Sequence, residues 1–451
     1  MDEQSQNKTP SNFLKTDRGK TKSTAVEIPS ISLPKGGGAI KGIEEKFQVS
    51  AVTGTLSFSI PIPLSPSRND FVPAIGLGYN SGSGNSPFGL GWQLPIPSIA
   101  RKTEKLLPQY RDEDDSDTFT ISGTEDLVPL LEKQSDRTYA RYNKPKTENG
   151  IDFLVKRYIP RIEGLFARIE KWTNTVTGET HWRTITKDNV HSYYGETSES
   201  RISDPHNSNR VFEWLLCKTH DDKGNIFINY FKKEDFVGIE NKLNEKNKIN
   251  NCTQTYLKKV VYGNKKAYYL GDAIPAENDF MFKILFDYGE HDNSVNIPKN
   301  IDSEVRPWTC RKDPFSSFRS GFEIRTYRRC ERIMVFHCFD ELPHSPYLTK
   351  SLQLFYDDNL NLTGNKNSIE GFSFLEKARQ NGHLWDALTN TYKTKYLPET
   401  EIRYQQHEWN TVIKSVTPEN LAHAPVGLSD KSYLWIDLFS EGIAGILTEK
   451  A

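Results

Sequence analysis

The sequence has 451 residues, of which 36% are hydrophobic and 12% aromatic, and its formal net charge is -1. This near balance of charge excludes a general electrostatic attraction to nucleic acid or to an anionic membrane surface. The odd number of cysteines, five, argues against a disulfide framework. No apolar run is long enough to span a bilayer, and the polar N-terminus lacks the apolar region of a Sec signal peptide.

The first predicted element follows a segment that favours disorder. Residues 1–35 are polar and lysine-rich and run into the sequence PKGGG, which is typical of a flexible hinge. In TLSFSIPIPL (residues 55–64), apolar and polar side chains alternate with a period of two, which predicts a strand. Because Pro61 and Pro63 cannot donate to a ladder, we expect an edge or terminal strand.

Strand patterns recur downstream, whereas long helical periodicity is scarce. THDDKGNIFINYF (residues 219–231) predicts two strands joined by a tight turn. Residues 373–380 (SFLEKARQ) favour a short helix, and the charged residues 232–255 favour a surface insertion. Further strands are predicted at 282–288 (FKILFDY), 332–339 (RIMVFHCF, apolar on both faces) and 352–356 (LQLFY). The expected fold class is mostly β, a large irregular multi-sheet domain with few short helices.

A glycine-rich stretch, YNSGSGNSPFGLGW (residues 79–92), raises the question of a binding site. It matches neither GxxxxGK[ST] nor GxGxxG, and Pro95 and Pro97 argue against the helix that a phosphate cradle needs. Its serines also fail the GxSxG spacing of a hydrolase elbow. The pattern therefore favours a chain of tight turns that use positive φ angles.

Two groups of residues offer atoms that could bind a metal. Cys330, His337 and Cys338 could contribute ligands but lack a CxxC knuckle, so buried structural positions are favoured. In RDEDDSDTF (residues 111–119), Asp112 and Asp114 fit the start of a calcium loop, but the rest of that pattern is missing. A solvated turn is the favoured interpretation, with calcium left as the alternative.

One pair of carboxylates has the spacing of a catalytic motif. Glu399 and Glu401 form the E-x-E pair that arginine-directed ADP-ribosyltransferases use for general-base chemistry. The upstream arginine and the Ser-Thr-Ser strand of such enzymes are missing, so a strand with outward carboxylates is favoured. We expect no enzymatic activity, no catalytic residues and no cofactor, and no cleavage of NAD above that of a Glu401→Ala control.

A resemblance extends over residues 36–451. TGTLSFSIPIPLSPSRNDFVPAIGLGYNSGSGNSPFGLGWQLPIPSIARKT, followed by TFTISGTEDLVPLL, resembles the start of the SpvB-type N-terminal domain. That domain opens the Salmonella virulence plasmid B protein and the TcB component of bacterial ABC (Tc) insecticidal toxin complexes. Ordered blocks continue the likeness: RYIPRIEGLFARIEKW, YYGETSESRISDP, VFEWLLCKTHDDKGN, DPFSSFRSGFEIRTYRRC and YLPETEIRY.

The resemblance implies a structural role for the glycine-rich stretch. In TcB-like proteins this region is part of a β-rich shell, shared with Rhs sheets, that encloses a separate toxic polypeptide. The glycines would then be turn residues and Trp92 an anchor beneath the turn. The candidate turn and packing residues are Gly76, Tyr79, Asn80, Gly82, Gly84, Asn85, Gly89, Gly91, Trp92 and Arg101.

The end of the chain resembles the opening of a β-propeller blade. YLWIDLFSEGIAGILTEKA (residues 433–451) is similar to the W-x-D-L-x-x-x-G-x-x-G start in TcB. Phe439 occupies the middle ligand position of a calcium-binding repeat, so Asp437 and Glu441 are not expected to hold a metal. The expected organisation is a disordered segment (1–35), an SpvB-like domain (36–430) and the truncated start of a propeller-like segment (431–451).

The resemblance implies a non-enzymatic delivery module, the N-terminal part of a Tc-toxin B-type subunit. Its expected partners are the remainder of its own subunit, a C-type effector-bearing subunit and, indirectly, an A-type translocation subunit, without nucleic acid or membrane insertion. It would be made in the bacterial cytoplasm and leave the cell within a toxin complex, without a Sec signal. Two alternatives remain: the targeting half of an ADP-ribosylating toxin, whose catalytic domain would lie beyond Ala451, and a surface glycan-binding β protein.

Overall fold

The computed structural model describes residues 54–357 and 372–404, except 105, 124, 165, 241 and 242, and the strand Gln48–Val49. Beyond Tyr404 it describes residues 412–415, 417, 419, 433–436 and 445–448. Two units are distinguished, one ending at Tyr404 and the other comprising residues 361–368 and 405–451. The segment 1–35 and the positions of Asp437, Phe439 and Glu441 lie outside the described residues.

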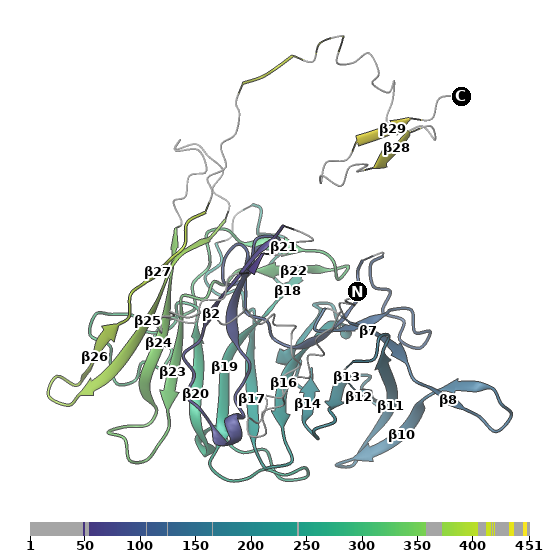
Figure 1. The fold of residues 1–451 in the computed structure, drawn as a ribbon, viewed down its shortest axis with the longest axis horizontal. Helices are drawn as coiled ribbons and strands as arrows, with labels where there is room; N and C mark the ends of the chain where they lie inside the picture. Colours follow the sequence, from purple (N-terminus) through teal and green to yellow (C-terminus); the bar gives the residue numbers. More distant parts are fainter. Residues whose placement is uncertain are drawn as a thin grey trace, which may run out of the picture. The chain divides into compact units, whose positions relative to one another are not determined.

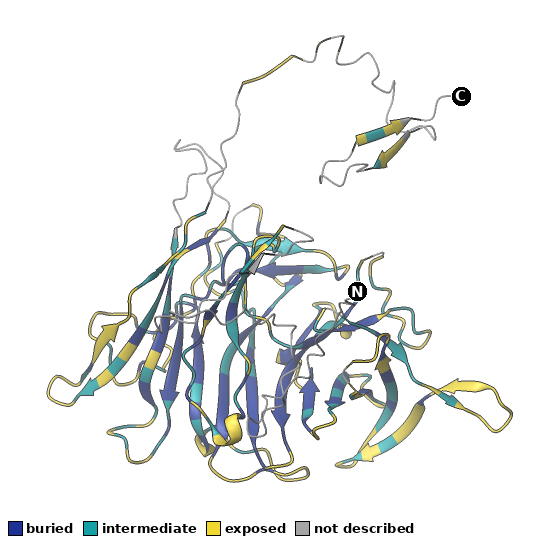
Figure 2. Cartoon of the chain, viewed as in Figure 1, coloured by how far each residue is buried: buried dark blue, intermediate teal, exposed yellow. Residues whose placement is uncertain are grey.

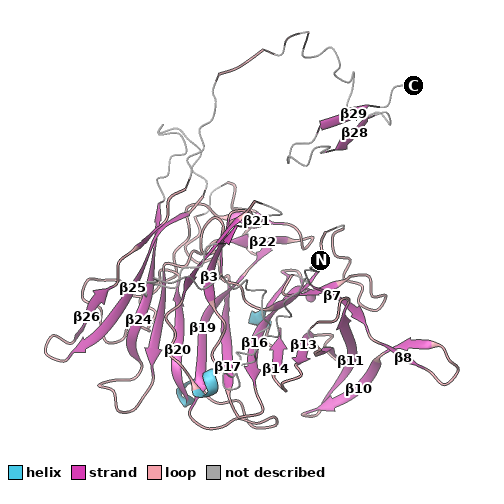
Figure 3. Cartoon of the chain, viewed as in Figure 1, coloured by secondary structure: helices cyan, strands magenta, loops and turns pink. Residues whose placement is uncertain are grey.

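Strands dominate the described residues, which confirms the mostly β, multi-sheet fold class (Figures 1 and 3). The regular helical structure in this part of the chain is limited to three short 3-10 turns: η1 (Arg68–Asp70), η2 (Ser198–Ser200) and η3 (Glu277–Asp279). No helix among the described residues is long and apolar enough to cross a membrane.

An N-terminal sheet of four strands precedes the main sheet in the described residues. It pairs in the order β1-β2-β3-β4 and is antiparallel throughout. Its strands are β1 (Gln48–Val49), β2 (Leu56–Pro61), β3 (Gly76–Asn80) and β4 (Trp92–Gln93). Phe58 and Ile60 of β2 are buried, as the alternating pattern predicts.

The main sheet of the described residues has eighteen strands. Its first half holds β5 (Ser98–Arg101), β6 (Phe119–Ile121), β7 (Glu125–Pro129), β10 (Asn143–Glu148), β11 (Ile151–Pro160), β12 (Arg168–Asn174), β13 (Thr180–Ile185), β14 (His191–Tyr194) and β15 (Arg201–Asp204). Its second half holds β16 (Asn207–His220), β17 (Ile226–Lys233), β19 (Thr255–Asn264), β20 (Phe280–Asp287), β23 (Arg332–His337), β24 (Tyr347–Asp357), β25 (Phe374–Asp386), β26 (Thr391–Tyr396) and β27 (Thr400–Glu401). Figure 1 shows the long strands of this sheet side by side.

Three small sheets complete the described structure. One comprises β18 (Cys252–Thr253), β21 (Phe315–Ser317) and β22 (Glu323–Thr326), and one is the hairpin of β8 (Leu131–Lys133) and β9 (Tyr139–Arg141). The third lies in the second unit and pairs β28 (Tyr433–Ile436) with β29 (Gly445–Thr448). Residues of the propeller-like opening thus include a β-hairpin, with Trp435 opposite Ile446.

The core of the first unit lies between the N-terminal sheet and the main sheet. Trp92, Trp182 and Trp214 are fully buried in one continuous apolar cluster that spans both sheets. Phe71 packs against Phe227 of β17 with ring centroids 5.7 Å apart. Figure 2 shows buried residues concentrated on the central strands of the main sheet and exposed ones at its turns. The burial of aromatic side chains therefore stabilises the packing of the N-terminal sheet against the main sheet.

Most of the predicted strands are confirmed. The segment 219–231 forms the end of β16, a turn and the start of β17. Residues 332–337 form β23, and its residues from Arg332 to Phe336 are buried, as a strand apolar on both faces requires. The patterns at 282–288 and 352–356 lie in β20 and β24.

The predicted helix at 373–380 is wrong, because the residues from Phe374 onward form β25. This strand pairs with β24 on one side and with β26 and β27 on the other. Leu375 and Ala378 contribute to the core from within it. The helix-forming side chains of LEKARQ are overridden by two ladders and by core packing.

Two further expectations need correction. β2 is not an edge strand, because Gln48 and Val49 of β1 pair with Ser57 and Leu56; Pro61 lies at the far end, opposite Gly76 of β3. Residues 232–255 are not simply a surface insertion. Glu245 within them is buried, and its carboxylate accepts hydrogen bonds from Arg325 and from the Tyr327 hydroxyl. Carboxylates of this segment neutralise cations that the sheet buries.

Candidate functional site

The glycine-rich stretch, residues 79–92, connects β3 to β4 in a folded-back loop. The Asn80 N–H donates to the Gly91 carbonyl at 2.9 Å, and the Gly91 N–H donates to the Gly84 carbonyl at 3.0 Å. Gly89 and Gly91 have φ angles of +96° and +79°, which favour glycine. Gly76 lies inside strand β3, and neither Gly82 nor Gly84 has a positive φ. The need for glycine conformations is thus concentrated at the second half of the loop.

Distant parts of the chain hold this loop in place. The Arg311 guanidinium donates to the Ser86 carbonyl at 2.6 Å and to the Asn85 side chain at 3.0 Å. Asp313 accepts from the Asn85 amide at 3.1 Å and from the Ser373 N–H at 2.6 Å. The loop therefore lies where three chain segments meet, and two of them, at residues 85–86 and 311–313, are more than 200 residues apart in the sequence.

Trp92 closes the loop from below. Its ring lies 5.9 Å from that of Phe58 and 5.3 Å from that of Tyr79, and it is fully buried. Its indole N–H donates to the Tyr404 hydroxyl at 2.9 Å. The loop thus covers an aromatic cluster in which the Trp92 indole nitrogen has a partner, as a buried tryptophan requires.

The acidic run at 111–119 forms a turn at residues 112–115 in which Glu113 and Asp114 are exposed, as predicted, but internal cations hold Asp112 and Asp117. Arg101, 2% exposed, donates to Asp112 and Asp117 at 2.7 Å each, and Lys171 reaches Asp112 at 2.5 Å. Burial by itself would raise the pKa of Asp112, but Lys171 and Arg101 outweigh it and hold the pKa below its usual range. Burial lowers the pKa of Lys171 to about 8. Of the two carboxylates that suggested calcium ligands, Asp112 is engaged by internal cations, whereas Asp114 pairs with Arg111 at the surface.

The other residues considered for chemistry are engaged in structural contacts. Glu399 accepts from Arg379 at 3.2 Å, and Glu401 lies in β27, 3.6 Å from Arg403. All five cysteines are free thiols. Burial raises the pKa values of Cys330 and Cys338, which disfavours the thiolates needed for metal binding or nucleophilic attack. His337 instead bonds the Ser65 hydroxyl at 2.7 Å.

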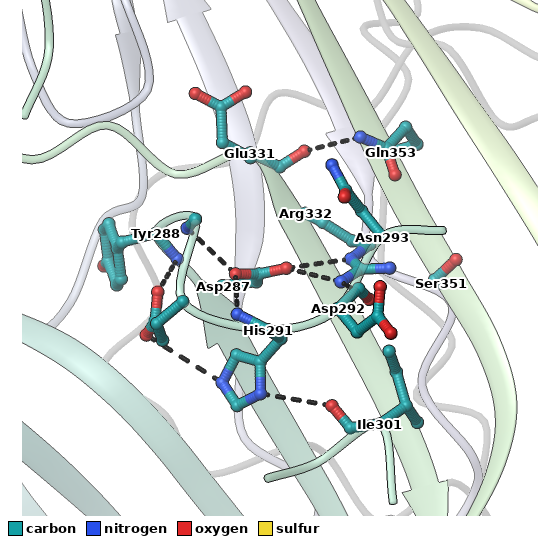
Figure 4. A network of polar contacts seen from close by, with 12 residues as sticks. Asp287, Tyr288, His291, Asp292, Asn293, Ile301, Glu331, Arg332, Ser351 and Gln353 are labelled. Atoms are coloured by element: carbon teal, nitrogen blue, oxygen red, sulfur yellow. Dashed lines mark hydrogen bonds and ion pairs between the residues drawn. The ribbon is translucent and has the colours of Figure 1, made fainter. Parts of the chain in front are cut away.

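A buried cluster that sequence reasoning missed lies at the end of β20. Potential ligand atoms of Asp287, Glu290 and His291 lie within 4.8 Å of one another (Figure 4). Asp287 accepts from Arg332 at 2.6 and 3.0 Å, and Lys258 forms an ion pair with Glu290. The sequence signal is only the short DYGEH, which has no ligand-spacing pattern.

Internal cations balance this cluster. The His291 Nδ1 lies 3.1 and 3.0 Å from the Ile301 and Ser303 carbonyls, so it carries the proton, and Nε2 accepts from Lys258 at 3.0 Å. Burial, and then Lys258, lower the pKa of His291, so the imidazole is neutral. A metal ion would have to displace both Lys258 and Arg332, and the arrangement is instead a charge-balanced support for the turn after β20.

Comparison with known proteins gives the family. The sequence pattern of the Salmonella virulence plasmid 65kDa B protein family (SpvB) matches residues 50–339, more than half of the chain. The chain belongs to the SpvB family. An SpvB relative from Salmonella choleraesuis (strain SC-B67), named mono(ADP-ribosyl)transferase SpvB, is 33% identical over 353 residues. These cover 76% of this chain but only 57% of the relative.

Solved structures extend the SpvB likeness to the whole fold. The N-terminal domain of effector protein SpvB from Salmonella typhimurium strain LT2 is 32% identical, with a TM-score of 0.63, and the match covers 71% of this chain and 97% of that domain. The TcdB2-TccC3 structure is 30% identical, with a TM-score of 0.70, over 94% of this chain and 20% of that one. The Photorhabdus luminescens Tc holotoxin pore matches with a TM-score of 0.72 and 30% identity, over 94% and 19%.

These likenesses confirm the SpvB and TcB resemblance that the sequence blocks carried. The glycine-rich stretch and Trp92 lie within the matched family region. Sequence reasoning missed the buried ion pairs of Arg101, Arg311, Arg325, Arg328 and Arg332. A signal existed in EIRTYRRCER (residues 323–332), where four arginines stand among residues that favour strands, such as Ile324, Thr326 and Tyr327.

Proposed function

We propose that this chain is the N-terminal part of a Tc-toxin B-type subunit, a non-enzymatic wall of the shell that encloses and delivers a toxic effector. The observation that carries the proposal is the likeness to TcdB2-TccC3, which extends over 94% of this chain but only 20% of that one. Its partners are the remainder of its own subunit, a C-type effector-bearing subunit and, indirectly, an A-type translocation subunit. It acts outside the producing cell.

The fold suits a wall. Strand pairing satisfies the backbone groups of a wide sheet, and ion pairs inside the sheet fix its shape without requiring a ligand. Weak contacts over a large surface hold the unfolded effector. Because these contacts bury too little apolar area, the effector does not fold against the wall. We assign residues 36–430 to this SpvB-like wall and residues 431–451 to the start of a propeller-like segment.

The glycine-rich loop shapes the wall in this proposal. It contacts Arg311 and Asp313 in the segment between β20 and β21, and Asp313 also accepts from Ser373 just before β25, which supports a role in positioning. The residues with this role are Gly76, Tyr79, Asn80, Gly82, Gly84, Asn85, Gly89, Gly91, Trp92 and Arg101. None of them acts on a substrate.

Immunoprecipitation from the source organism tests the proposal. Antibody against residues 54–404 should recover a polypeptide several times longer than 451 residues together with a second, effector-bearing polypeptide. Protease should spare the effector until the complex is opened with denaturant, because the shell excludes the enzyme. Pre-immune serum is the control. Recovery of a long polypeptide whose effector is digested at once would contradict the proposal.

The name of the Salmonella relatives favours a second candidate function. Those relatives are named as mono(ADP-ribosyl)transferases, so this chain could be the targeting half of such a toxin, with its catalytic part elsewhere in the polypeptide. A precipitated polypeptide only moderately longer than 451 residues that transfers ADP-ribose from NAD would support this candidate. In that case Glu401→Ala should leave the activity unchanged, because Glu401 pairs with Arg403 in strand β27.

A further inference from the structure

A polar groove lies on the main sheet, on the face opposite the apolar core. It has a volume of about 460 Å³ and crosses β23, β24, β25 and β26, with the loop 293–297 as its side wall. Leu352 and Leu354 of β24 belong to the core, whereas the alternate residues Ser351, Gln353 and Phe355 line the groove. Strand alternation therefore places Ser351 and Gln353, with Phe355 beyond them, in a cavity outside the core.

Side chains, rather than the strand backbone, are available for recognition in this groove. The strands that form its floor pair with one another over their length, from Arg332 opposite Gln353 to Asn381 opposite Tyr396. The amide and carbonyl groups of β23, β24 and β25 are therefore used in ladders on both sides, whereas β26 pairs with β25 and, at Tyr392, with Ile297. An extended peptide usually binds by adding to free backbone groups at a sheet edge. The paired strands of this floor are poorly suited to that mode of binding.

Two buried polar atoms of the floor have no partner. The Arg379 Nε and the Asn381 Oδ1 are both shielded from solvent and form no hydrogen bond. They belong to residues two apart on β25, so both side chains lie on the groove face. Asn381 is 8% exposed. A donor and an acceptor left unpaired at such depth cost stability unless a ligand or a water molecule satisfies them.

A chain of hydrogen bonds fixes the orientation of the Asn381 amide. Its Nδ2 lies 3.2 Å from the Ser351 hydroxyl, which lies 2.9 Å from the His383 Nε2. The His383 Nδ1 lies 3.0 Å from the Thr394 hydroxyl. With Nδ2 donating to Ser351 and Ser351 donating to His383, the Asn381 oxygen remains as the free acceptor.

The charges of the groove are already paired. Arg332 donates to Asp287 and to the Asp292 carbonyl, the latter at 2.8 Å, and it is held between these groups (Figure 4). Arg379 donates to Glu399. Burial, and then the Arg332 charge, lower the pKa of His383 to about 4, so the ring is neutral. The groove is therefore polar but offers no unbalanced charge to an anion.

We propose that this groove binds a neutral carbohydrate through Arg379, Asn381 and the side chain of Tyr396. A sugar hydroxyl both donates and accepts, so adjacent hydroxyls can satisfy the Arg379 Nε and the Asn381 Oδ1 together. Tyr396, 66% exposed, stands at the rim; the Arg379 guanidinium lies 5.0 Å from its ring centroid, and the opposite ring face can stack on the apolar face of a sugar ring. A carboxylate only accepts, so a carboxylate by itself would leave the Asn381 oxygen unpaired.

A printed array of neutral mono- to tetrasaccharides tests the proposal on the fluorescently labelled 451-residue chain. Saturation-transfer NMR with the strongest array ligand then measures the affinity. We expect at least a tenfold loss of affinity in Arg379→Lys, which retains the charge but removes the Nε donor. Asn381→Leu should behave in the same way, and Lys393→Ala, an exposed residue of β26, should bind as the unmodified chain does.

Each other outcome overturns the proposal. Absence of binding to every array sugar would exclude it, as would binding that survives both groove substitutions. Tyr396→Ala addresses the case in which a groove variant unfolds, because this exposed rim residue can be removed without disturbing the core, and it should weaken binding at least threefold. Preferential binding of an acidic hexapeptide, sensitive to Arg379→Lys, would replace the sugar with a peptide ligand.

Discussion

Buried arginines are the residues whose burial carries the largest electrostatic cost in this fold. Arg328 is fully buried, forms an ion pair with Glu234, donates to the Trp308 and Val237 carbonyls, and lies 4.5 Å from the Trp308 ring. Arg101 has a comparable set of partners. Removing a guanidinium from water is costly, so each buried arginine requires several acceptors at once. The acidic segments that look like surface loops in the sequence supply them.

Arg101→Met should lower the free energy of unfolding by about 3–5 kcal/mol, because it leaves Asp112 and Asp117 beside an apolar side chain without their main partner. Urea denaturation followed by tryptophan fluorescence measures the change. Arg111→Ala is the matched control, since Arg111 pairs with Asp114 at the surface, and its effect should stay within about 0.5 kcal/mol. Equal effects of the two substitutions would show that the Arg101 network carries no stability.

At the scale of elements, strand pairing determines the secondary structure where local composition does not. LEKARQ has helix-forming side chains, yet β25 is a strand, because ladders on both sides and the core contacts of Leu375 outweigh local preference. The end strand β10 carries Lys144, Pro145 and Lys146 in a row. Lysine and proline on an edge discourage pairing with other chains, so this edge is protected from aggregation.

The loop from Tyr79 to Trp92 provides a test at the same scale. An alanine Cβ at position 89 would lie 2.8 Å from the Ser373 carbonyl oxygen, and the backbone there has a φ of +96°. Gly89→Ala should therefore destabilise the protein by about 2–4 kcal/mol. Gly84→Ala, where no atom lies within 4 Å of the new Cβ, should change stability by less than about 0.5 kcal/mol. Differential scanning calorimetry compares the two variants, and a similar melting temperature for both would contradict the assigned strain.

At the scale of the whole molecule, neutral histidines that are buried or half-buried are distributed through the first unit. Burial is the leading cause of the lowered pKa values of His181, His191, His291, His337 and His344. Burial, and then the neighbouring His191, lower the pKa of His220 to about 4. The unfolded chain therefore binds protons at a higher pH than the folded one does, and acidification favours unfolding.

Stability should fall as the pH decreases from 6.5 to 4, the interval between the unfolded and folded pKa values of His220. His220→Phe retains an aromatic ring beside His191 but cannot titrate, so it should reduce this loss by about 2 kcal/mol. Tyr193→Phe, which leaves His220 in its stack, should keep the original slope. Urea midpoints measured at intervals of half a pH unit give the profile. An unchanged slope in His220→Phe would rule out this histidine as a source of acid sensitivity.

Regular alternation and turn residues allowed the strands to be predicted. β23 and the β16–β17 hairpin, for example, can be predicted from residues that are neighbours in the chain. The same local information carried the SpvB resemblance, because its blocks are contiguous. It also led to a wrong helix at 373–380 and missed the internal cation that holds Asp112, since Leu375 and Asp112 are governed by partners far away in the sequence.

The sequence by itself determined the β class, the family and the glycine-rich turn, since periodicity, ordered motifs and glycine content are local properties. Only the tertiary structure decided which charges are buried and which polar atoms meet. Arg311 reaches Ser86 across 225 residues, and Arg325 reaches Glu245 across 80. Side chains from four strands together create the groove around Arg379 and Asn381. Such contacts depend on strand order and register, which local preferences leave undetermined.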